Sequence, residues 1–139
     1  MPQFSEVSKQ RLATCDPRLQ LVLNEAIKYV DFTVLVGYRD REAQNQAVLE
    51  GKSQKPWPTG NHNASPSRAV DIAPWLPDVK VDWKDVVAFG RLMGVVQLIG
   101  MQHGIKLRFG LDWDGDWRTV TSDPDENLMD APHVELVDP

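Results

Sequence analysis

The chain has 139 residues, of which 42% are hydrophobic and 25% are charged, and this composition is typical of one compact globular domain. A formal net charge of -5 argues against DNA or RNA as partners, because nucleic-acid binding needs a positive field. The single cysteine, Cys15, excludes an internal disulfide. We therefore expect a single domain over residues 1–139, held together by an apolar core.

The pattern of apolar residues gives no sign of a segment that enters a membrane. The most apolar stretch, residues 86–101, contains Arg91 and Gln97 and is shorter than the roughly 18 to 20 apolar residues that span a bilayer. Residues 1–15 lack a basic start followed by an apolar run. No membrane insertion and no secretory signal peptide are therefore expected.

The first third of the chain is predicted to contain three helices and one strand. Ser5 is placed to cap a first helix, and Asp16 followed by a proline begins a second with apolar residues at helical spacing. Residues 32–36 are β-branched or aromatic and predict a buried strand. Residues 40–49 are good helix formers that follow a capping residue, Asp40.

The remainder mixes short strands, loops and one long helix. Strands are predicted at residues 69–73, 105–109 and 133–137, and a helix is predicted from near Asp82 to Gly104. Proline, glycine and asparagine mark residues 51–67 as a loop, and residues 110–129 also have loop composition. Because no βαβ rhythm is present, we expect an α+β domain with a small, mostly antiparallel sheet flanked by helices.

Two of the three histidines, His62 and His133, lie where loops meet predicted strands, and acidic residues are nearby. Neutral imidazole and carboxylate groups suit zinc, and catalytic zinc keeps three protein ligands and one open position. Together with Asp71, which interrupts an apolar strand, they would form such a set. Spacing alone leaves the metal site open, because histidines in such places are more often ordinary hydrogen-bonded residues.

The order of these residues resembles the M15 family of zinc peptidases, which contains D-Ala-D-Ala peptidases and phage L-alanyl-D-glutamate endopeptidases. The family pattern is a His, then Ala-x-Asp on a strand, and later an acidic residue three positions before a second His that precedes x-Glu. Here the matching segments are His62, residues 69–71 and residues 130–135, and residues 37–39 match the family's arginine. Residues 105–113 resemble phage endolysins of the L-alanyl-D-glutamate type.

The loop between the first two ligands departs from the family pattern. The usual Ser-x-His-x-x-Gly-x-Ala-x-Asp becomes residues 60–71, with Gly60 in place of the serine, no internal glycine and two additional residues. A strict alignment from Asp71 would put Ala64 at the ligand position. We assign His62, because a loop can absorb two residues whereas alanine cannot bind a metal. The rival, His103, is expected at a helix C-terminus, where a cation suits the dipole.

The resemblance also implies roles for residues near the metal. Zinc lowers the pKa of its bound water toward about 7. Asp130 would accept the proton and pass it to the leaving amine, and Arg39 would stabilise the oxyanion. The alternatives are that Asp130 only caps a turn and that Arg39 forms a surface salt bridge. Glu135 is expected to support a ligand or to face out of the strand, and is not counted as catalytic.

A second ion is considered at the acidic loop that follows. Asp112, Asp114 and Asp116 carry oxygens on alternate residues, as the start of a calcium loop does, although the glycine is misplaced for an EF-hand. A Ca2+ ion is therefore one hypothesis, and a solvated acidic turn is the other. Further oxygens would come from residues later in the same loop: Asp123, Asp125 and Glu126.

The implied activity is zinc-dependent hydrolysis of the L-alanyl-D-glutamate bond of peptidoglycan stem peptides by a phage endolysin, which leads to host lysis. Such an enzyme would be a monomer that accumulates in the host cytoplasm and reaches the cell wall through a membrane pore. The alternatives are a D-alanyl-D-alanine carboxypeptidase or dipeptidase, an inactive wall-binding relative, and a metal that only holds the fold together. Four tryptophans fall in or beside the loops that would rim the site, where their rings would stack on substrate, and ordinary core packing is the alternative for most of them: Trp57, Trp75, Trp113 and Trp117.

Overall fold

Two capped helices open the described part of the chain, which covers residues 2–119 and 130–137 of a computed structural model. Helix α1 (Glu6–Leu12) begins where the Ser5 side chain accepts a hydrogen bond from a backbone amide. Helix α2 (Pro17–Ala26) begins at Asp16 in the same way, with proline in its first turn. Both predicted caps are confirmed.

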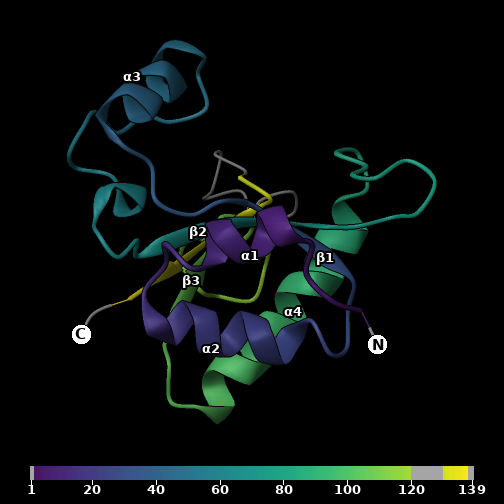
Figure 1. Cartoon of the computed structure of the whole chain (residues 1–139). Helices are drawn as coiled ribbons and strands as arrows, with labels where there is room; N and C mark the ends of the chain where they lie inside the picture. The colour runs from purple at the N-terminus through teal and green to yellow at the C-terminus, as the bar shows by residue number, and fades with distance from the viewer. Residues whose placement is uncertain (1, 120–129, 138–139) are drawn as a thin grey trace.

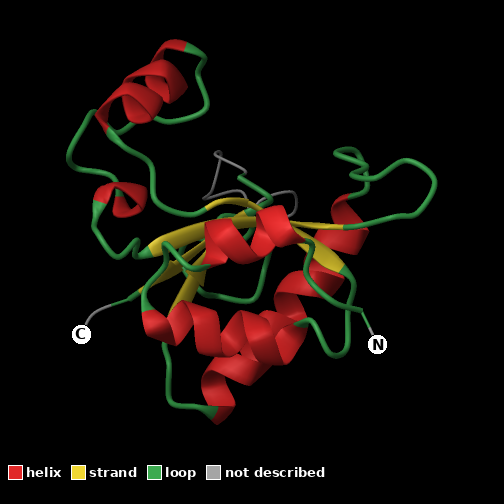
Figure 2. Cartoon of the chain, in the orientation of Figure 1, coloured by secondary structure: helices red, strands yellow, loops and turns green. Residues whose placement is uncertain are grey.

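The four strands form one open antiparallel sheet in the order β1-β2-β4-β3 (Figure 2). The predicted strands are confirmed, although β3 begins two residues later than expected and β4 ends one residue earlier. Their bounds are β1 (Phe32–Val36), β2 (Ala69–Pro74), β3 (Leu107–Phe109) and β4 (His133–Leu136). The two central strands, β2 and β4, are almost entirely buried, and β2 is apolar apart from Asp71, whereas β4 buries the polar residues His133 and Glu135 among its apolar ones.

The longest helix, α4 (Val86–Gln102), packs against α2 and against the sheet. It begins at the Asp85 cap, three residues later than the start predicted near Asp82. Apolar residues from these helices, from α1 and from all four strands form the core. The expected α+β architecture with a small antiparallel sheet is confirmed. None of the helices in the described residues is long and apolar enough to cross a bilayer.

The connection from β1 to β2 stands apart from this core. It contains α3 (Arg41–Leu49), capped by Asp40 as predicted, and a single 3-10 turn, η1 (Asn61–Asn63). Figure 1 shows α3 projecting from the side of the molecule, well away from α2 and α4. Within α3 only Gln44 and Ala47 are buried.

The sheet register places polar residues next to one another. Asp71 of β2 lies opposite His133 of β4 and opposite Val36 of β1. A bulge between Val34 and Val36 adds one residue to β1 just before this point. Because a bulge bends the strand and re-aims the chain that follows, it sets the course of Gly37 beside the two polar residues.

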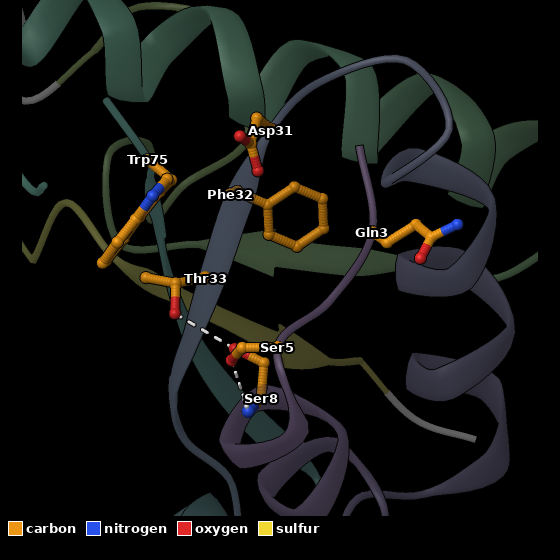
Figure 3. A pocket seen from close by; sticks show the side chains of 7 residues that line it. All are labelled: Gln3, Ser5, Ser8, Asp31, Phe32, Thr33 and Trp75. Atoms are coloured by element: carbon orange, nitrogen blue, oxygen red, sulfur yellow. Dashed lines mark hydrogen bonds between the residues drawn. The ribbon is translucent and has the colours of Figure 1, made fainter. Parts of the chain in front are cut away.

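A pocket of about 200 Å³ lies at the opposite, N-terminal end of β1 (Figure 3). Its lining contains no histidine, and it lies by Phe32, whereas Asp71 pairs with Val36 at the other end of the strand. Trp75 lines this pocket, so the expectation that it rims the metal site is wrong. The other lining residues are mostly polar: Gln3, Ser5, Ser8, Asp31 and Thr33.

Candidate metal centre

The three predicted metal ligands converge at one point beside the central strands. His62 Nε2 lies 3.2 Å from Asp71 Oδ1, and His133 Nδ1 lies 3.3 Å from the same oxygen. Tetrahedral zinc with bonds of about 2.0 to 2.1 Å places its ligand atoms roughly 3.3 Å apart, so these separations suit that ion. The structure brings His62, and not Ala64 or His103, into the cluster.

The outer nitrogen of each histidine contacts an acceptor, which fixes the role of the inner nitrogen. His62 Nδ1 donates to the Gly37 carbonyl at 2.8 Å, and His133 Nε2 donates to Glu135 Oε1 at 2.6 Å. A neutral imidazole that donates from one nitrogen presents a lone pair at the other. When both rings are neutral, as metal binding requires, both lone pairs face the Asp71 carboxylate, which is also an acceptor. The residues present fit a cation held between them.

Charge in this cluster is closely balanced. Burial raises the pKa of Asp71, but hydrogen bonds and positive charge from His133 and His62 outweigh it and hold the pKa well below its usual range. Burial lowers the pKa of His133, but its contacts with Asp71 and Glu135 raise it to about 9. Without a metal, the cluster therefore keeps a proton where a divalent cation would bind, and binding of such a cation would release that proton.

His62 is anchored from two sides, which explains how the lengthened loop is tolerated. Its ring donates to the Gly37 carbonyl, and its own carbonyl accepts a hydrogen bond from the Arg39 amide at 2.8 Å. A side chain at Gly37 would come within 2.5 Å of the Arg11 carbonyl oxygen, so only glycine lets the chain pass this close to α1. The additional residues lie between His62 and β2, where they do not displace the ligand.

Glu135 supports His133 from behind. Glu135 Oε1 accepts a hydrogen bond from His133 Nε2. The other carboxylate oxygen, Oε2, accepts hydrogen bonds from Arg108 Nη2 at 2.6 Å and from Arg108 Nε at 3.0 Å. Burial raises the pKa of Glu135, but His133 and Arg108 outweigh it and lower the pKa to about 2. A carboxylate behind a ligating histidine orients the ring and increases its basicity. The supporting role expected for Glu135 agrees with these contacts, whereas Arg108 was missed.

We expect Glu135→Gln to weaken metal binding by roughly 10- to 100-fold. The oxygen of the glutamine amide can accept a hydrogen bond from His133 or from Arg108, but not from both. The amide nitrogen then faces the other donor and cannot bond to it. Metal affinity is measured by competition with a chromophoric chelator. Glu50→Gln, which changes an exposed carboxylate paired with Lys52, is the control. Equal affinity of Glu135→Gln and the unmutated protein would show that Glu135 does not orient the ligand.

The two residues expected to act on the substrate both border the cluster. Asp130 Oδ2 lies 3.9 Å from His133 Nδ1, and Arg39 Nη2 lies 3.8 Å from Asp71 Oδ2. Burial and the negative charge of Asp71 raise the pKa of Asp130. A carboxyl group that holds a proton more readily than usual and a guanidinium group thus flank the candidate metal ligands.

The turn that carries Asp130 is held against the end of β3. The Asp130 amide donates to the Gly110 carbonyl at 3.1 Å, and the Gly110 amide donates to the His133 carbonyl at 2.9 Å. A Cβ atom on Gly110 would overlap the Asp130 carbonyl, so this close approach requires glycine. The backbone carbonyl of Asp130 also accepts a hydrogen bond from the His133 amide at 3.1 Å, which closes the turn before β4.

The acidic turn does not support the calcium hypothesis. Asp112, Asp114 and Asp116 lie close together, but their oxygens accept backbone amides of the same turn. The Asp112 carboxylate, for example, accepts the Trp117 amide at 2.9 Å. These hydrogen bonds explain why the three carboxylates lie close together: each stabilises the backbone of the turn that carries it. The other proposed calcium ligands lie outside the described residues: Asp123, Asp125 and Glu126.

The tryptophans are divided between different parts of the surface. The centroid of the Trp113 ring lies 5.3 Å from the centroid of the His133 ring, so Trp113 borders the cluster as expected. Trp117 is 69% exposed and lines a separate small pocket against α4.

His103 is the C-terminal cap of α4 and is exposed, in agreement with its predicted place at a helix end. Of these side chains, Trp113 is the one placed to contact a substrate at the candidate metal centre.

Comparison with known proteins gives one consistent result. The family model described as phage L-alanyl-D-glutamate peptidase matches residues 1–137. The chain is 34% identical over 139 residues to the L-alanyl-D-glutamate peptidase of Escherichia phage T5, covering 97% of this chain and 98% of that protein. It is also similar to the crystal structure of the Serratia marcescens L-Ala D-Glu endopeptidase ChiX, with a TM-score of 0.74 and 25% identity over 97% of this chain and 90% of the other. The chain belongs to the phage L-alanyl-D-glutamate peptidase family.

Proposed function

We propose that this protein is a zinc-dependent endolysin that hydrolyses the L-alanyl-D-glutamate bond of bacterial peptidoglycan stem peptides. The observation that carries the proposal is the convergence of His62, Asp71 and His133, with both outer histidine nitrogens bound to acceptors. The match of residues 1–137 to a family named for this bond favours the endopeptidase over a D-alanyl-D-alanine carboxypeptidase.

His62, Asp71 and His133 would hold the zinc ion, which, when bound, would supply Lewis-acid activation of water and of the scissile carbonyl. Asp130, which borders the candidate ligands, would take a proton from the attacking water and deliver it to the leaving amine. Its raised pKa supports this exchange, because the carboxyl must hold the proton before releasing it. Arg39, which faces Asp71, would stabilise negative charge that develops on the carbonyl oxygen.

The proposed place of action follows from the relatives. The matched T5 protein is a phage enzyme, and we propose that this chain likewise acts on the host cell wall. In this proposal it accumulates as a monomer in the host cytoplasm and is released through a membrane pore. Bacterial peptidoglycan stem peptides are then the partner that it meets outside the membrane.

Two measurements test this proposal: removal and return of the metal test the zinc dependence, and analysis of the products tests which bond is cleaved. We expect about one zinc ion per chain, loss of peptidoglycan hydrolysis after dialysis against a chelator, and recovery with zinc. Mass spectrometry of the products should show peptides with a new N-terminal D-glutamate. Release of free D-alanine would instead indicate a carboxypeptidase, and the absence of new termini would indicate a wall-binding relative. Full activity without metal would contradict the zinc assignment alone.

A further inference from the structure

Gln44 is a buried polar side chain to which the roles proposed above assign nothing. It lies on α3, the helix that projects from the molecule, and it is 1% exposed. Burying an amide is costly unless its hydrogen bonds are made. The partners of Gln44 therefore indicate what this side chain does.

All four hydrogen-bonding positions of the Gln44 amide are used. Oε1 accepts hydrogen bonds from Arg39 Nη1 and from Asn63 Nδ2, each at 3.1 Å. Nε2 donates to Ser53 Oγ at 3.0 Å and to the Lys55 carbonyl at 2.5 Å. The amide cannot be reversed, because Arg39 offers only donors and the Lys55 carbonyl only an acceptor.

These contacts hold Arg39 at both ends. In the described residues, the guanidinium group is bound by Gln44 and faces Asp71 Oδ2 at 3.8 Å. At the backbone, the Arg39 amide donates to the His62 carbonyl, and Asn63 Nδ2 donates to the Arg39 carbonyl at 3.0 Å. Arginine otherwise has many rotamers, so the Gln44 contact selects one that borders the metal ligands.

We infer that Gln44 is a positioning residue that holds the Arg39 guanidinium where it stabilises the developing negative charge. This inference rests on the role proposed above for Arg39. A donor that is already oriented needs no reorganisation during the reaction, and a displacement of about 1 Å can cost about 100-fold in rate. Gln44 thus links α3 to Arg39 and also to Asn63 of η1.

Two substitutions of Gln44 separate this role from a structural one. Gln44→Met keeps the length without hydrogen bonds, and we expect kcat to fall about 10- to 100-fold while zinc content is unchanged and KM changes by less than about threefold. Gln44→Glu keeps the acceptor for Arg39 but loses both donors to residues 53–55. It should retain a clearly higher kcat than Gln44→Met even though it is no more stable in thermal unfolding.

The matched control is Gln46→Met, on the exposed side of the same helix, which should leave kcat and KM unchanged. If Gln44→Glu is as inactive as Gln44→Met, the glutamine acts by holding residues 53–55, and the inference is wrong. If Gln44→Met does not fold, Gln44→Asn replaces it, because the shorter amide is withdrawn from Arg39.

A double-mutant cycle tests whether the effect passes through Arg39. In an Arg39→Ala background, Gln44→Met should lower kcat by less than about twofold, because the group that it positions is gone. A loss of tenfold or more in that background would overturn the inference. Wild-type activity of Arg39→Ala would overturn it too, and would remove the role proposed for Arg39. Zinc content and product termini would still decide the peptidase assignment independently.

Discussion

His133→Ala is expected to lose zinc and to lower peptidoglycan hydrolysis by at least about a thousandfold, and His62→Ala is expected to do the same. Each histidine supplies one of three ligand atoms, and a catalytic zinc site with two remaining ligands neither retains the ion nor orients it. Removal of either ring also removes one hydrogen-bond donor from the acceptor behind it, the Gly37 carbonyl or Glu135. Zinc is measured by atomic absorption, and lysis by loss of turbidity of purified peptidoglycan.

His103→Ala is the control for these two variants, because His103 is an exposed residue at the end of α4 and lies outside the cluster. It should keep full zinc content and activity. Thermal unfolding of all three variants shows whether the fold is retained. Zinc binding and full activity in His62→Ala would contradict the assignment of this ligand across the lengthened loop.

Asp130→Asn is expected to keep its zinc and to lower kcat by about 100- to 10,000-fold, the range that a positioned general acid-base contributes. Asparagine has nearly the same shape and preserves the backbone turn to Gly110 and His133, but it cannot take up a proton. The measurements are the rate of release of new D-glutamate termini and the zinc content of the same sample.

Asp78→Asn, in the exposed turn that follows β2, is the control for the loss of a carboxylate. A kcat for Asp130→Asn that equals that of the control would mean that Asp130 only shapes the turn before β4. A loss of zinc in Asp130→Asn would instead mean that this carboxylate contributes to metal binding.

Local signals were sufficient to predict most of the elements, because capping residues and strand composition act over a few positions. Ser5, Asp16 and Asp40 each cap the helix predicted from them. The predicted start of β3 was wrong because residues 103–105 complete the C-terminal cap of α4. The Ile105 amide donates to the Gly100 carbonyl and completes the end of α4, so the chain joins the sheet only at Leu107.

The cluster of candidate metal ligands could be predicted because its residues belong to a spaced motif, whereas the residues that support them could not. Arg108 reaches Glu135 only through the register of β3 on β4, which no local pattern encodes. Gln44 is buried because residues 53–55 fold back over it. One signal was available: Gln44 and Ala47 are three apart on a helix and so share a face, which places the amide on the inner side.

The position of β4 in the sheet has a consequence for incomplete chains. It is the last strand in sequence, yet it lies between β2 and β3 and carries His133 at its first residue. A chain shortened before this strand would lack the third ligand and would also expose the unpaired edges of β2 and β3, which invite aggregation. We therefore expect the sheet and the candidate metal centre to become complete at the same point of synthesis, and partly made chains to lack hydrolytic activity.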